Sequence, residues 1–216
     1  MTSPTINTTA GQTIARELLV AYLNTGTAGT PVWSPLGTRV EDSSADYDWG
    51  DETKKDILGN THSTMKKPVI TQSFDPCNLD SGDAAIVKVW ELAVRDQDAQ
   101  ALCTMDVLVV HTYAGTSGAA FAERYPSSMV KPTGLGGPGG GSIEMPIDIT
   151  FGGARSTGTA AIVYTYAETA DESPVEGKTY YTKSGTVYTE FTGTSFASGT
   201  TYYERTGQTV AYTAAA

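Results

Sequence analysis

The chain has 216 residues, a formal net charge of -10 and 39% hydrophobic residues, enough for one sizeable core or a core plus a small module. Because its excess of acidic side chains repels phosphates, tight binding of DNA or RNA is disfavoured. No apolar stretch approaches the roughly 18 residues needed to cross a bilayer, so we expect a soluble protein without membrane insertion. We expect both cysteines, Cys77 and Cys103, to be buried reduced thiols, because two cysteines are too few for a disulfide framework.

The first predicted strand covers residues 16–23, although periodicity alone also allows a helix there. Residues 41–67 follow, with seven acidic residues, four lysines and few aliphatic ones. This composition predicts a solvent-exposed excursion, either a long loop or a hairpin. Alternate carboxylates after Asp46 resemble the start of a calcium loop, but Ile57 stands where an EF-hand needs its bidentate glutamate. A solvated acidic segment is therefore favoured over a metal site.

A helix is predicted over residues 84–95, with Asp83 as its N-cap. Its apolar residues Ile86, Trp90 and Val94 follow the spacing of a buried stripe, so we expect the helix to pack on a sheet.

Further strands are predicted over residues 102–113, 143–151 and 159–166. In residues 143–151, isoleucine, methionine and phenylalanine alternate with Glu144, Pro146, Asp148 and Thr150, which indicates a half-buried strand. Pro146 lacks an amide donor, so this strand lies at a sheet edge or is broken there. The glycine-rich residues 134–139 match the letters of a dinucleotide-binding motif, but a strand follows instead of a helix, which favours a flexible loop.

The composition changes near residue 167 and predicts two domains, residues 1–166 and 167–216. The second domain has no leucine, isoleucine, methionine or tryptophan, but has six tyrosines and twelve threonines. A short repeat, at residues 177–185 and 199–207, predicts β-hairpins in a small accessory module. In a strand, Tyr180 and Tyr181 point to opposite faces, so we expect one ring of each Tyr-Tyr pair to pack inward.

No catalytic, cofactor or metal motif stands out. His62 and His111 have no neighbouring ligand at metal spacing, and nucleotide-binding, hydrolase and zinc-protease motifs are absent. We therefore expect no cofactor, no metal and no enzymatic activity.

Segments across about three quarters of the chain resemble, in order, the major tail protein of long-tailed, siphovirus-like bacteriophages, the subunit that builds the tail tube. The segments are ELLVAYLN at residues 17–24, PVWSPLG at 31–37, DYDW at 46–49, ETKKDILG at 52–59, ITQSFDP at 70–76, VLVV at 107–110, ERYP at 123–126, IEMPIDITF at 143–151 and GTAAI at 158–162. The residues after 167 resemble the accessory β domains that some tail proteins display outside the tube.

The resemblance implies a mainly β fold, in which a β-sandwich contributes strands to an intersubunit β-barrel. One α-helix, expected over residues 84–95, flanks the sandwich, and the long loop over residues 41–67 contacts the next ring. It further implies a virion protein that forms stacked, usually hexameric, rings, with the tape measure protein, other tail proteins and DNA in transit as partners.

Charge leads to two site hypotheses within this framework. A conduit that should not hold DNA needs an acidic lumen, and Glu144 and Asp148 are the candidates. Ring stacking would use opposite charges in the excursion, which predicts salt-sensitive assembly. The candidate stacking residues are Asp46, Asp48, Asp51, Glu52, Lys54, Lys55, Lys66 and Lys67.

Two other classes remain open. A tail terminator, head-tail connector or decoration protein would stop at a single ring, whereas a tube protein forms open-ended stacks. An enzyme or a calcium-dependent sugar-binding module that uses the aromatic C-terminal domain would need to respond to a ligand.

Overall fold

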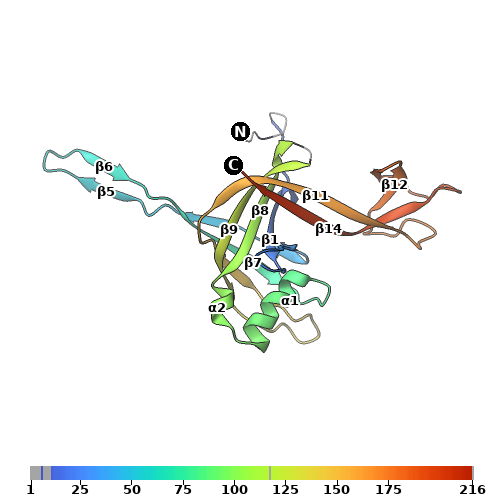
Figure 1. Ribbon diagram of the computed structural model, residues 1–216, viewed down its shortest axis with the longest axis horizontal. Coiled ribbons are helices and arrows are strands. Elements are labelled where there is room, and N and C mark those ends of the chain that lie inside the picture. Colours follow the sequence, from blue (N-terminus) through green and yellow to red (C-terminus); the bar gives the residue numbers. More distant parts are fainter. Residues whose placement is uncertain (1–5, 7–10, 117, 216) are drawn as a thin grey trace. The chain divides into compact units, whose positions relative to one another are not determined.

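The computed structural model describes residues 6, 11–116 and 118–215. They form a mainly β structure dominated by a large antiparallel sheet, which confirms the predicted class (Figure 1). The strands are β1 (Leu19–Asn24), β2 (Trp33–Leu36), β3 (Val40–Asp42), β4 (Ala45–Asp48), β5 (Glu52–Lys55), β6 (Thr61–Thr64), β7 (Val69–Cys77), β8 (Met105–Thr116), β9 (Ala119–Pro132), β10 (Ile147–Thr150), β11 (Ser156–Glu168), β12 (Tyr180–Ser184), β13 (Val187–Phe191) and β14 (Tyr202–Ala214). The helical elements are a 3-10 turn (Arg16–Leu18), α1 (Ala84–Trp90), a π-helical segment (Glu91–Arg95) and α2 (Ala99–Leu102).

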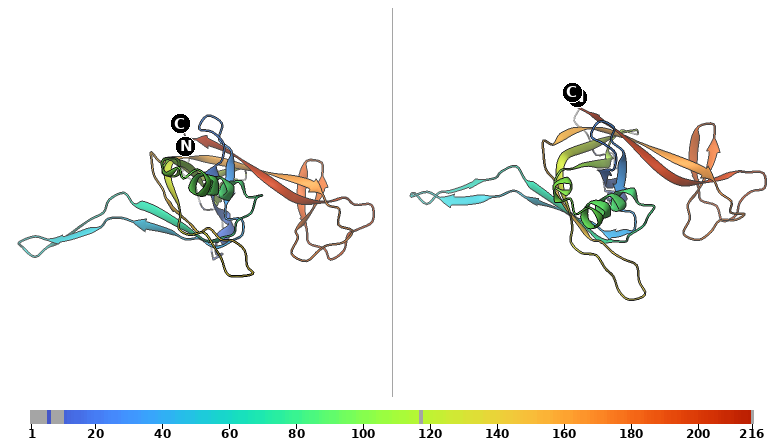
Figure 2. Two further views of the ribbon diagram at one scale, coloured as in Figure 1. Left: turned by 90° about the horizontal axis from the view of Figure 1, so that it is seen from below. Right: turned by 60° about the horizontal axis from the view of Figure 1, so that its bottom comes forward.

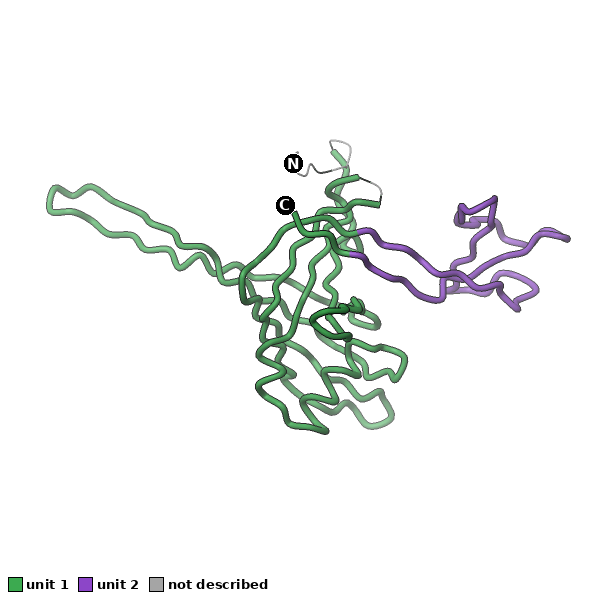
Figure 3. Tube along the Cα trace, in the orientation of Figure 1, with its two compact units in different colours: residues 1–160, 212–216 green, residues 161–211 purple. Residues whose placement is uncertain are grey.

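The chain divides into two compact units (Figure 3). Unit 1 comprises residues 1–160 and 212–216, and unit 2 comprises residues 161–211. The boundary predicted between residues 166 and 167 lies inside β11, and the last residues of the chain belong to unit 1. Strands β11 and β14 therefore each have residues in both units.

Strand β8 is the centre of one region of unit 1, where it pairs with β1 and β9. Residues 107–110 are all buried, because this apolar, β-branched run is covered on both faces. The predicted strand at residues 16–23 is confirmed from Leu19 onward, after the 3-10 turn.

The predicted strand at residues 102–113 begins later, at Met105, because residues 99–102 form α2. Asp98 caps this short helix by accepting a hydrogen bond from the Ala101 amide at 2.9 Å. Cys103 follows the helix and is exposed, so the prediction that both cysteines are buried is wrong. Cys77, at the end of β7, is buried, and burial raises its pKa to about 12.

The second region of unit 1 places β10 between β7 and β9. The predicted strand at residues 143–151 is shortened to Ile147–Thr150 and begins directly after Pro146, where the missing amide donor ends regular pairing. Ile147 and Ile149 are buried, while Asp148 and Thr150 point to the other face. The core joins both regions and α1; it contains Ala21, Leu23, Leu36, Phe74, Cys77, Ala85, Ile86, Val89, Met105, Val107, Val130, Met145, Ile147 and Ile149.

Residues 84–95 are helical throughout, as predicted, although the last turn is π-helical. The Asp83 carboxylate accepts hydrogen bonds from the Ala85 and Ile86 amides at 3.0 and 3.1 Å, which confirms the N-cap. The buried stripe is formed by Ala85, Ile86 and Val89, so the predicted Ile86 is confirmed; the predicted Trp90 is partly buried and packs against the core. Val94, in the π-helical segment, is exposed, so the predicted stripe does not continue to this residue.

The excursion predicted over residues 41–67 is confirmed in part. Strands β3 and β4, at its start, pair with β7, whereas residues 50–67, called the arm below, form an exposed hairpin. Within residues 11–116 and 118–215, strands β5 and β6 pair only with each other, as a two-stranded sheet. The arm extends away from the rest of unit 1 in all views (Figures 1 and 2). Every residue in its two strands is exposed.

Unit 2 contains the predicted hairpin, formed by β12 and β13, and β14 pairs with the free side of β12. Tyr180 and Tyr181 are both buried, which corrects the prediction of one inward ring for this pair, whereas in the second pair Tyr202 is buried and Tyr203 is only partly buried. Tyr180 packs against Phe196 with ring centroids 4.9 Å apart, and Tyr181 packs against Tyr166 at 5.0 Å. Aromatic residues therefore cover both faces of this thin sheet.

Candidate functional site

The outward face of β4, β7, β10 and β9 carries the candidate lumen residue Asp148. Its carboxylate lies 3.5 Å from the Lys131 ammonium group in the adjacent strand β9. Both side chains are about half exposed, so this ion pair is weak. A shallow cavity of about 250 Å³ lies here, lined by Asp46, Thr71, Gln72, Ser73, Met129, Lys131, Asp148 and Thr150.

Glu144 does not share a strand with Asp148, because regular pairing in β10 starts only at Ile147. Its backbone instead forms isolated bridges with Gly136 and Asn78. The Glu144 amide donates to the Gly136 carbonyl at 2.6 Å, and the Gly136 amide donates back at 3.0 Å. These bonds close the glycine-rich loop predicted at residues 134–139. The structure does not unite the two predicted lumen acids in one strand.

The candidate stacking residues fall into two groups. Asp46 and Asp48 lie on β4, which pairs with β7 as part of the body of unit 1. The other six lie on the arm: Asp51, Glu52, Lys54, Lys55, Lys66 and Lys67. Lys54 lies 3.0 Å from Glu52 in an exposed ion pair that contributes little to folding. The arm therefore displays charged side chains on a structure separate from the core.

Asp56 fixes the turn at the tip of the arm. Its carboxylate accepts hydrogen bonds from the amides of Leu58 and Asn60 at 2.9 and 2.8 Å. Side-chain hydrogen bonds from Asn60 and then from His62 hold the Asp56 pKa below its ordinary value. The neighbouring side chain of Ile57 is fully exposed, so the turn presents an aliphatic group directly to solvent.

A half-buried charge network joins β8, β9 and Arg155, the residue directly before β11. Glu123 accepts a hydrogen bond from His111 Nε2 at 3.2 Å and is paired with Arg155. The other ring nitrogen of His111 lies 2.7 Å from the Tyr113 hydroxyl. Burial alone would raise the pKa of Glu123, but hydrogen bonds from His111 and Arg155 outweigh it and lower this pKa.

The sequence suggested only a structural role for His111 and gave no signal that Glu123 and Arg155 meet, since they lie 32 residues apart. The geometry fits that structural role, because the network links β8, β9 and the residue before β11 and keeps Glu123 charged.

No group of three or more histidine, cysteine, aspartate or glutamate side chains in residues 6, 11–116 and 118–215 is arranged to hold a metal ion. In the same residues, no helix combines the length and apolar character needed to cross a membrane. The sequence matches no protein-family model. It also has no significant match among curated proteins.

Proposed function

We propose that this chain is a structural virion protein that self-assembles into stacked rings, forming the tail tube of a long-tailed, non-contractile bacteriophage. The rings are homohexamers, and the tube conducts DNA into the host during ejection. The tape measure protein and other tail proteins are its partners.

The observation that carries the proposal is the arm. A two-stranded sheet with every strand residue exposed has marginal stability alone and adds nothing to its own core. Partner subunits explain such an element, because their surfaces would bury it. The charges of the arm suit contact with an adjacent ring, which is the role proposed for its six candidate stacking residues.

Unpaired strand edges support the same reading. In the described part of the chain, β2 pairs only with β1, and β3 and β4 pair only with β7. Open edges are templates for pairing with another chain, and ring closure would remove them. In this proposal the two regions around the core form a β-sandwich, and their edges join neighbouring copies into a continuous β-barrel.

The outward face around Asp148 lines the lumen in this assembly. Its mixture of carboxylates, hydroxyls and one lysine offers DNA phosphates little attraction, so DNA passes without tight binding. Glu144, which is positioned by its pairing with the glycine-rich loop, is the second acidic residue that faces the lumen in this proposal.

Negative-stain electron microscopy of the purified protein across a concentration and salt series tests the function. Hollow tubes with a regular axial repeat are the expected result, with fewer tubes at high salt because exposed charges are screened. Closed single rings would contradict the tube and favour a terminator, connector or decoration protein. Monomers at every concentration and salt would contradict self-assembly of the isolated chain.

A further inference from the structure

The tip of the arm exposes two adjacent aliphatic side chains to solvent. Ile57 is 103% exposed and Leu58 is 82% exposed. The Asp56 hydrogen bonds hold the backbone of this turn in one shape, so the pair is displayed on a fixed scaffold. Exposed aliphatic groups held in this way are typical of a surface that a partner buries.

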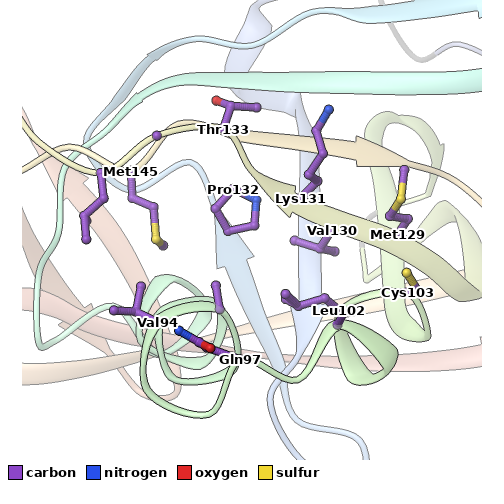
Figure 4. A pocket seen from close by; sticks show the side chains of 14 residues that line it. Val94, Gln97, Leu102, Cys103, Met129, Val130, Lys131, Pro132, Thr133 and Met145 are labelled. Atoms are coloured by element: carbon purple, nitrogen blue, oxygen red, sulfur yellow. The ribbon is translucent and has the colours of Figure 1, made fainter.

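An apolar groove of about 550 Å³ lies elsewhere on unit 1 (Figure 4). Val94 and Leu102, from the helical segments, lie on one side of it, while Pro132 and Met145 lie on the other. Its volume falls within the range of sites that bury small apolar ligands. The exposed Cys103 lies at its border.

The charges around the two features are complementary. The arm has four lysines against Asp51, Glu52 and Asp56, a net charge of +1, whereas the rest of the chain has a net charge of -11. Residues 91–98, beside the groove, carry three acidic residues against Arg95, and Lys131 lines the groove itself, which leaves a net charge of -1. An acidic surface with an apolar hollow therefore suits a basic arm with an apolar tip.

No arm residue is among the described residues that line the groove of the same chain. We propose that Ile57 and Leu58 of one copy dock into this groove of a second copy. The inference rests on the proposed self-assembly and adds the two surfaces that meet.

Cys103 allows a direct test by disulfide trapping. A Leu58→Cys variant is incubated with oxidised glutathione, which accepts the electrons as the two thiols lose their protons and form a disulfide. Docking predicts covalent multimers on a non-reducing gel, with mass spectrometry linking position 58 to Cys103. Cys77 does not compete, because its thiol is buried and burial raises its pKa to about 12.

Two controls make the trapping specific. Leu58→Cys combined with Cys103→Ser should lose the covalent multimers. Val187→Cys places a thiol at another exposed aliphatic position, 61% exposed in a hairpin of unit 2, and should trap poorly. Equal trapping at positions 58 and 187, or links chiefly between two copies of position 58, would overturn the docking.

A second variant needs no new thiol. Ile57→Ser with Leu58→Ser should raise the protein concentration needed for assembly by about tenfold or more, because the docked side chains would no longer be apolar. Val187→Ser should leave that concentration unchanged. Assembly of the double variant at the wild-type concentration would contradict the docking.

The outcomes separate this inference from the tube proposal. Trapping to Cys103 without tubes supports the docking and contradicts the tube. Tubes without trapping to Cys103 support the tube and contradict the docking.

Discussion

At the scale of single residues, the charge network around Glu123 is a little-exposed electrostatic feature of unit 1. Only 13% of its side chain is exposed, and it is bonded to a histidine in β8 and to an arginine that directly precedes β11. Removal of one partner leaves the remaining charges without a hydrogen-bonded counterion. A single substitution in the network should therefore lower the stability of the fold.

Glu123→Gln should lower the free energy of unfolding by about 2 kcal/mol at pH 7, measured by urea denaturation. The pKa of Glu123 is lowered in the folded state, so its stabilisation is present above the unfolded pKa of about 4.3. It is lost as the pH falls through the folded pKa. The variant should therefore lose less stability than the wild type between about pH 5 and pH 3.

Glu52→Gln on the arm is the matched control, because Glu52 is exposed and should change stability by less than about 0.5 kcal/mol. Parallel acid titrations of wild type and Glu123→Gln would contradict the assigned role of the network.

At the scale of elements, α1 depends on its cap. Asp83→Ala should cost about 1 kcal/mol, because the Ala85 and Ile86 amides lose their acceptor next to the core. Asp83→Asn keeps an acceptor oxygen and should recover most of this loss. Thermal unfolding of the three proteins measures the effect, and equal melting temperatures for Asp83→Ala and wild type would refute it.

The arm should be needed for assembly but should contribute very little to the free energy of unfolding. Replacement of residues 53–64 by a short glycine-serine turn should change the unfolding free energy by less than about 0.5 kcal/mol. The same change should prevent tubes in electron micrographs. A deletion starting at Asp46 would be a poor test, because it also removes β4 from its pairing with β7.

Elements with strong local signals were predictable from sequence. Asp83 with the apolar spacing after it specified α1, and Pro146 marked the start of β10. The arm followed from its charge and lack of aliphatic residues. Each of these signals acts within a few residues of the structure that it specifies.

Tertiary contacts decided what the sequence did not specify. Tyr180 and Tyr181 are both buried because Phe196 and Tyr166 pack on opposite faces of the sheet. Cys103 is exposed because α2 interrupts an apolar run that favours a strand. The alternation of apolar and polar residues over 143–151 predicted that Glu144 and Asp148 lie on one strand. Glu144 instead pairs with Gly136 of the glycine-rich loop and lies outside β10.

At the scale of the whole molecule, charge on the proposed lumen should govern DNA passage. Asp148→Lys would place a second lysine beside Lys131 and create an attractive site for phosphates in every subunit. Phage carrying this variant should eject DNA more slowly, and the delay should shrink at high salt. Ejection kinetics measure the effect, with Glu190→Lys in unit 2 as a control at an exposed position.

Unchanged ejection by assembled Asp148→Lys tails would place Asp148 outside the lumen. Equal slowing by Glu190→Lys would instead indicate a general effect of net charge.

The path of β11 and β14 makes unit 2 an insertion within unit 1 instead of a terminal extension. After unit 2, the chain returns to unit 1, where the Ala215 amide donates to the Thr157 carbonyl at 2.8 Å and Tyr212 bonds Ser156 at 3.1 Å. Truncation after residue 166 should therefore destabilise unit 1, whereas splicing residue 160 to 212 through a short linker should preserve its melting temperature. If so, β11 and β14 mark the two positions at which a different domain could be inserted in place of unit 2 without changes to unit 1.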